Sequence, residues 1–137
     1  MAHAFAVGAV LHWEMFDNNR PQGAEIKNKF LLVLGAKPGN DVLMVLATTQ
    51  KHYMKLNPGC RAKEGYYFIL GVAKEFFPKD TWLLLAELKV ANAAMLIDGG
   101  MKGTIRVCGN LRDELVRAII NCLKKTNDVS EYHLSLL

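Results

Sequence analysis

The fold is decided by the stretch Lys29-Phe30-Leu31-Leu32-Val33-Leu34-Gly35-Ala36-Lys37-Pro38-Gly39-Asn40-Asp41-Val42-Leu43-Met44-Val45-Leu46-Ala47-Thr48-Thr49. Its two apolar runs, 29–34 and 42–47, have the length of β-strands and flank a polar turn that contains Pro-Gly. In an antiparallel hairpin the start of one strand lies beside the end of the other. The sequence therefore predicts a β-hairpin that holds Lys29 near the hydroxyls of Thr48 and Thr49. A cation beside a hydroxyl is suited to holding a phosphate.

Short strands and turns continue on both sides of this hairpin. Apolar, aromatic and β-branched residues predict strands at 7–16, 66–70, 81–85 and 103–108. Turn-forming residues predict loops at 17–22, 51–65 and 76–80. The segment 87–96 is expected to hold a strand end and a short helical turn, which Asp98-Gly99-Gly100 should break. The pattern is typical of a mainly β protein.

The hydrophobic period changes near the end of the chain and predicts one C-terminal helix. Asn110 is the expected N-cap and Asp113 the third helical position of a capping-box-like start. One helical face is apolar and consists of Leu111, Leu115, Ile119, Cys122 and Leu123. The helix is expected to end near 124–125, and the tail after Thr126 receives no assignment. The strands and this helix together predict a small, strongly bent sheet or barrel with helices packed on it.

Length and composition fit one soluble domain over residues 1–137. With 51% hydrophobic and 22% charged residues, the chain can bury a core and is not disordered. No apolar run reaches the roughly 18 residues of a membrane span, so no membrane association is expected. The apolar start lacks a basic n-region and is interpreted as a first strand, not a signal peptide. The net charge of +4 is compatible with a polyanionic partner without requiring one.

The cysteines and histidines predict neither a disulfide framework nor a metal site. Cys60, Cys108 and Cys122 are odd in number, far apart, and form no CxxC pair. The four histidines are scattered and show no ligand spacing. These features favour a reducing cytoplasm and no bound cofactor.

Six segments, in order along the chain, carry a resemblance to a known family. They are Val7-Gly8-Ala9-Val10-Leu11-His12-Trp13, Lys29-Phe30-Leu31-Leu32-Val33-Leu34, Val45-Leu46-Ala47-Thr48-Thr49, Phe77-Pro78-Lys79-Asp80-Thr81-Trp82, and Gly103-Thr104-Ile105 followed by Leu111-Arg112-Asp113-Glu114-Leu115. Their order resembles the PemK/MazF/Kid family of toxin–antitoxin endoribonucleases. No single motif is diagnostic; the evidence is the order, which covers most of the chain.

The resemblance implies a fold, an activity and partners. The fold would be an SH3-like β-barrel of five to seven short strands with a C-terminal helix, in a cytoplasmic homodimer. The activity would be metal-independent cleavage of single-stranded RNA, with the 2′-hydroxyl as nucleophile and a 2′,3′-cyclic phosphate as product. A protein antitoxin would block the RNA groove at the dimer face.

The resemblance also implies three catalytic residues. Lys29 stands where the family has an Arg that opens the second strand, and Thr48 stands at the family's strand-end Thr. Such a pair would hold charge on the phosphoryl oxygens. Glu25, four residues before Lys29, is the candidate general base. Arg20, Lys27, Thr49, Gln50 and His52 are the candidate RNA-binding residues.

Three departures from the family pattern keep a second interpretation open. Lys29 replaces an Arg, and a lysine lacks the rigid fork of a guanidinium. Phe30 replaces the usual Pro, and Ala86 holds the place of an acid, with Glu87 next to it. Glu87 would be a poor substitute unless a bulge re-aims it, because a one-residue shift reverses the face of a strand. The alternative is therefore a weakened or inactive barrel that binds RNA or a protein.

Aromatic residues and His12 each have a structural and a functional interpretation. Trp13, Tyr53 and Tyr66 would stack on single-stranded bases if they were exposed, although aromatic residues of a small barrel more often lie in the core. His12 lies on a predicted strand beside Trp13 and is expected on a sheet face.

Overall fold

The computed structural model describes residues 5–16, 27–49, 59–63, 65–69, 76–77, 79–126 and 129–137. This part of the chain forms strands β1 (Ala9–Phe16), β2 (Lys27–Gly35), β3 (Val42–Thr48), β4 (Gly59–Arg61), β5 (Tyr66–Ile69), β6 (Thr81–Ala91) and β7 (Ile105–Asn110), and helices α1 (Ala93–Lys102), α2 (Asp113–Lys124) and α3 (Glu131–Ser135). The predicted strands and C-terminal helix are present, and the mainly β fold is confirmed. In the described residues, no helix is both long and apolar enough to cross a bilayer.

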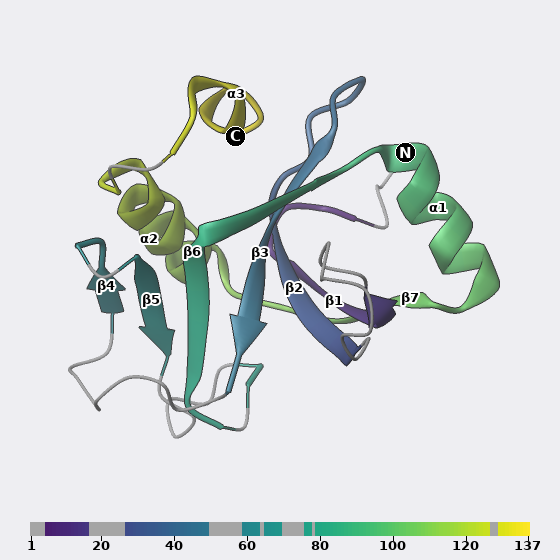
Figure 1. The fold of residues 1–137 in the computed structure, drawn as a ribbon, viewed down its shortest axis with the longest axis horizontal. Coiled ribbons are helices and arrows are strands. Elements are labelled where there is room, and N and C mark those ends of the chain that lie inside the picture. The colour runs from purple at the N-terminus through teal and green to yellow at the C-terminus, as the bar shows by residue number, and fades with distance from the viewer. Residues whose placement is uncertain are drawn as a thin grey trace, which may run out of the picture.

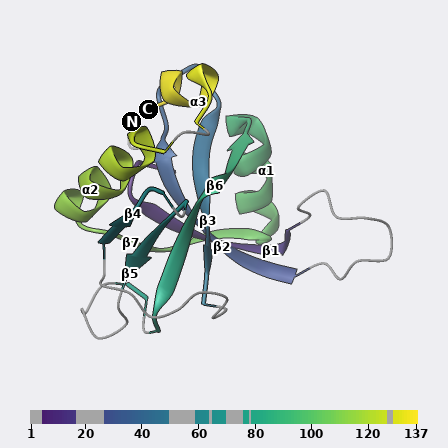
Figure 2. The same ribbon diagram turned by 60° about the vertical axis from the view of Figure 1, so that its left-hand side comes forward.

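The strands form one antiparallel sheet in the order β4-β5-β6-β3-β2-β1-β7, as Figure 1 shows. Within the described residues β4 and β7 are its two edges, so this sheet is open and a closed barrel stays an expectation. Helices α1 and α2 lie on opposite sides of the sheet, which is also visible in the turned view of Figure 2.

The predicted hairpin is present as β2 and β3, with Phe30 opposite Ala47 and Leu32 opposite Val45. Side chains alternate between the two faces of a strand. Leu32 and Val45 therefore pack toward α2, whereas Leu31 and Leu46 pack toward α1. Because both faces of the hairpin are covered, its sequence is apolar without the usual alternation.

The C-terminal helix begins later than the sequence predicts. Asn110 is the last residue of β7, opposite Ala9, and the N-cap is Arg112, which makes no side-chain capping bond. The chain stays extended because Leu111 is buried and its N–H donates to the carbonyl of Gly8. The apolar face of α2 is buried as predicted, and the helix ends at Lys124.

The tail after Thr126 forms α3, which packs against the turn end of the hairpin. The hydroxyl of Tyr132 donates to a carboxylate oxygen of Asp41 over 2.8 Å, and Nζ of Lys37 donates to the carbonyl of Ser135 over 3.3 Å. The backbone of Leu136 occupies the space where a side chain on Gly35 would lie. The absence of a side chain at Gly35 thus lets the tail pack directly on β2.

Helix α1 continues through Asp98-Gly99-Gly100, so the predicted break is wrong. Asn92 caps its start, since its side-chain oxygen accepts from the N–H of Met95 over 3.1 Å, and Gly103 ends it with φ of 80°. Gly99 is buried against Ile105 of β7, and a Cβ there would overlap that side chain. This glycine serves close packing of the helix on the sheet, which outweighs its poor helix propensity.

The adjacent glycines should respond oppositely to alanine. Gly99→Ala is expected to lower the free energy of unfolding by about 1–3 kcal/mol, because the added methyl overpacks against Ile105. Gly100→Ala should raise it by up to about 1 kcal/mol, because a Cβ there meets only ordinary contacts and alanine favours the helix. Urea denaturation of both variants is the measurement, and equal effects would contradict this account of Gly99.

A disulfide joins Cys60 of β4 to Cys122 of α2, with the two Cα atoms 5.4 Å apart. The number and spacing of the cysteines argued against a disulfide framework, and for this pair that prediction is wrong. Separation along the chain, 62 residues here, gave no information on their separation in space. Strand β4 itself lies inside the predicted loop 51–65. Its three residues are too few to produce a detectable pattern.

Candidate functional site

Lys29 and Thr48 belong to one row of side chains that crosses the sheet on its α1 side. The row is defined by cross-strand partners: Trp13 faces Lys29, Thr48 faces Trp82, and Trp82 faces Phe68. The β2–β3 register places Phe30 opposite Ala47, and continuing it by one residue brings Lys29 beside Thr48. The hairpin thus juxtaposes the predicted cation and hydroxyl on one face.

The row is partly accessible and partly core. Lys29, Thr48 and Trp13 are half-buried, whereas Trp82 and Phe68 are each only 1% exposed. The rings of Trp82 and Phe68 stack with their centroids 4.8 Å apart. This buried stack supports the strand beside Thr48, and within the row Trp13 is the ring that can meet a ligand. Tyr66, at 2% exposed, is core and not a stacking platform.

The other predicted site residues divide into two groups. Thr49 is exposed immediately after β3, and Lys27 opens β2 opposite Phe16. Four more lie outside the described residues, namely Arg20, Glu25, Gln50 and His52. The expected base and the expected first-loop contacts therefore stay predictions.

A bulge lies around Ala86, the position at which the resemblance would place an acid. Val45 faces Leu88 while Leu46 faces Leu84, so β6 holds three extra residues, 85–87, between these pairs. Ala86 and Glu87 are both exposed in this bulge. A bulge re-aims side chains, which is the condition under which Glu87 could serve in place of the missing acid.

A second polar cluster, which the sequence did not reveal, lies on the opposite face of the sheet. We define the His12 cluster as His12, Glu14, Phe30 and Arg106. His12 faces Phe30 on one side and Arg106 on the other. Nη2 of Arg106 lies 3.3 Å from Nδ1 of His12 and 3.7 Å from Oε1 of Glu14. No sequence signal links Arg106 to a strand 94 residues earlier; only the β1–β7 pairing does.

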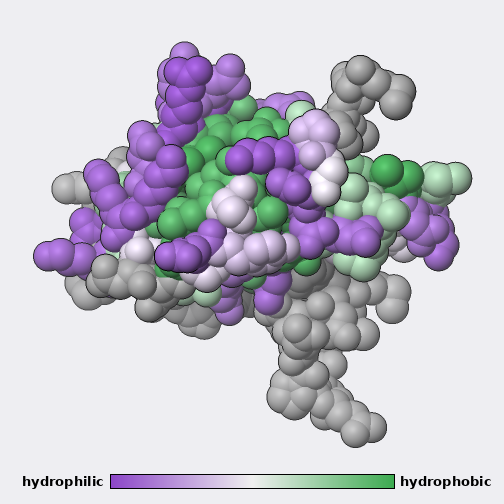
Figure 3. All heavy atoms as spheres, turned by 90° about the horizontal axis from the view of Figure 1, so that it is seen from above, coloured by the Kyte–Doolittle hydropathy of each residue, from purple (hydrophilic) through white to green (hydrophobic). Residues whose placement is uncertain are grey.

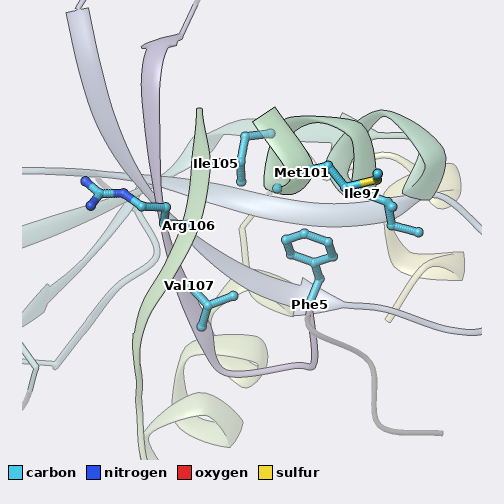
Figure 4. Close-up of a pocket in the computed structure, with 7 residues that line it drawn as sticks. Phe5, Ile97, Met101, Ile105, Arg106 and Val107 are labelled. Carbon is cyan, nitrogen blue, oxygen red and sulfur yellow. The ribbon is translucent and has the colours of Figure 1, made fainter. Parts of the chain in front are cut away.

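An apolar groove of about 560 Å³ lies between α1 and β7. Figure 4 shows Phe5, Ile97 and Met101 gathered on one side of β7, whereas Arg106 extends from its other side. Met101 is 84% exposed, and apolar residues are prominent over the α1 end of the molecule in Figure 3. Lys29 and Thr48 do not line this groove, and nothing within the described residues indicates what would cover it.

No protein-family model matches this chain, and a search of curated proteins finds no match. The resemblance to the PemK/MazF/Kid family therefore depends on the ordered segments quoted above. Within the described part of the chain, no group of three His, Cys, Asp or Glu side chains could hold a metal ion.

Proposed function

We propose that this chain is a toxin-type endoribonuclease that cleaves single-stranded RNA without a metal ion. The observation that carries the proposal is the placement of Lys29 beside Thr48 on adjacent strands. Lys29 would neutralise the scissile phosphate, and the Thr48 hydroxyl would donate to a phosphoryl oxygen as negative charge develops. The 2′-hydroxyl of the substrate would lose its proton and attack the phosphorus as the bond from phosphorus to the 5′-oxygen breaks, which gives a 2′,3′-cyclic phosphate on one fragment and, after protonation of the leaving oxygen, a 5′-hydroxyl on the other.

Proton transfer needs a base beyond this pair. Glu25 is the proposed base, and Glu87 is its substitute because of the bulge in β6. Thr49, Lys27, Arg20, Gln50 and His52 would contact RNA beside the scissile phosphate.

The proposal includes the architecture and partners implied by the resemblance. These are an SH3-like barrel, a homodimer, a protein antitoxin and a cytoplasmic location. One observation opposes the location, since a persistent disulfide is typical of oxidising compartments. A cytoplasmic form would have Cys60 and Cys122 as thiols.

The alternative function is a binding module that retains the RNA face without cleavage. Lys29 in place of Arg favours it, because a flexible point charge holds a phosphate more readily than it orients a transition state. Ala86 at the acid position favours it as well.

Single-stranded RNA incubated with chelator-treated protein separates the two functions. The endoribonuclease predicts fragments ending in 2′,3′-cyclic phosphate, detected by mass spectrometry. Intact RNA, together with binding that weakens as salt rises, would establish the module instead. Intact RNA without detectable binding would contradict both the endoribonuclease and the RNA-binding module.

A further inference from the structure

The strongest unassigned feature is the His12 cluster, which lies on the face of the sheet opposite to Lys29. Its row runs across the α2 side from Arg106 through His12 and Phe30 to Ala47, Leu83, Tyr67 and Cys60. At one end of the row the disulfide attaches β4 to α2, and the row members Ala47, Leu83 and Tyr67 are buried. At the other end the side chains are open, with Phe30 39% exposed and the Arg106 side chain 61% exposed.

The polar contacts within the cluster fix the chemistry that it offers. An arginine has only N–H donors, so Nδ1 of His12 must accept from Arg106. Nε2 of the neutral ring then carries the hydrogen and is a donor. Within the described residues, both contacts of Arg106 use Nη2, so Nη1 and Nε are available to a ligand. The contact with Glu14, at 3.7 Å between exposed side chains, is weak and can be displaced by an anion.

Phe30 adds an aromatic surface directly beside these donors. Its ring centroid lies 5.0 Å from that of His12 and 6.3 Å from that of Phe76. Phe76 therefore lies near the ring of Phe30, while more than a third of Phe30 is exposed to solvent. An exposed ring next to a guanidinium suits a nucleobase stacked beside its own phosphate.

We infer that the His12 cluster is a second nucleic-acid subsite, which holds one phosphate and one base of a single-stranded RNA. Arg106 and Nε2 of His12 bind the phosphate, and Phe30 stacks on the base. Lys29 and Phe30 are consecutive residues near the start of β2, on opposite faces. An RNA strand that bends around this end of the sheet would therefore reach both the Lys29–Thr48 site and the His12 cluster. The inference rests on the proposed function for its RNA ligand, but not on cleavage.

A 2′-O-methylated RNA strand tests binding alone, because it lacks the attacking hydroxyl. Its affinity is measured by fluorescence anisotropy over a range of salt concentrations. Arg106→Ala should weaken binding about tenfold and lower the salt slope by about one. Phe30→Leu should weaken binding at least about fivefold with no change in slope, since it removes a stacking ring and no charge. Arg117→Ala, which removes an equal charge from the exposed face of α2, is the matched control.

Three outcomes decide the matter. Loss of affinity in both cluster variants, with the control unchanged and thermal unfolding intact, supports the subsite. Wild-type affinity in either variant overturns it. A change in molar mass by light scattering, with affinity unchanged, also overturns it and assigns the surface to a protein contact. If both cluster variants lose affinity but the wild type never cleaves unmodified RNA, the endoribonuclease is contradicted while the subsite is supported.

Discussion

Reduction of the Cys60–Cys122 disulfide is expected to lower the free energy of unfolding by about 4 kcal/mol, because opening a loop of this length returns chain entropy to the unfolded state. The effect should be large here because β4 has only three residues and, within the described residues, lies at the sheet edge and pairs only with β5. Cys60 is an exposed residue, whereas Cys122 is buried in the α2 interface.

Guanidinium denaturation with and without a dithiol is the measurement, and Cys60→Ser should reproduce the reduced form. Cys108→Ser is the control, because Cys108 is not in a disulfide and lies on the other edge strand, β7. Identical unfolding midpoints for oxidised and reduced protein would show that β4 is held by packing alone. Hydrogen exchange should locate the loosening in β4 and β5.

Thr48→Ala is expected to slow RNA cleavage by about 10²–10³-fold, the typical cost of removing one donor to a developing negative charge. Thr48→Ser keeps the hydroxyl and should retain most of the activity. Thr48 is half-buried, so its substitution should change stability less than activity. Single-turnover cleavage of an RNA oligonucleotide, read alongside thermal unfolding, separates the two effects.

Two substitutions of Lys29 should change the cleavage rate in opposite directions. Lys29→Ala is expected to lower cleavage by a similar factor, because the cation is lost from the phosphate. Lys29→Arg should raise it, because a guanidinium can hold two phosphoryl oxygens at once. Lys124→Ala removes the same charge from α2, on the opposite side of the sheet, and should leave cleavage unchanged. Equal cleavage rates for Lys29→Ala and the wild type would show that Lys29 has no role in the reaction.

The local features of the fold were predictable because they depend on neighbours in sequence. The hairpin, the apolar face of α2 and the end of that helix at Lys124 follow from apolar periodicity, turn residues and charge. Where these rules failed, a contact with another element had overridden them. Ile105, in the strand that follows α1, makes Gly99 suitable within the helix, and the pairing of Asn110 with the distant Ala9 delays the start of α2.

The candidate site likewise has one part that the local sequence predicts and another that depends on pairing between strands that are not consecutive. The hairpin alone predicts that Lys29 lies near Thr48, since antiparallel pairing joins the start of one strand to the end of the next. The bulge beside Glu87 was not predictable, because it arises from a mismatch between β3 and β6, which are not consecutive in the chain. Arg106 was missed for the same reason, since it reaches His12 only through the pairing of β1 with β7.

By itself, the sequence determined that this chain forms a mainly β sheet with a central apolar hairpin and an amphipathic helix, because strand and helix periods are local properties. Tertiary structure alone decided the order of the strands, the joining of Cys60 to Cys122, and the arrangement of His12, Phe30 and Arg106 on one face. The physical reason is that these contacts join segments far apart in the chain. Their formation depends on how the whole core packs, and no short stretch of sequence records that.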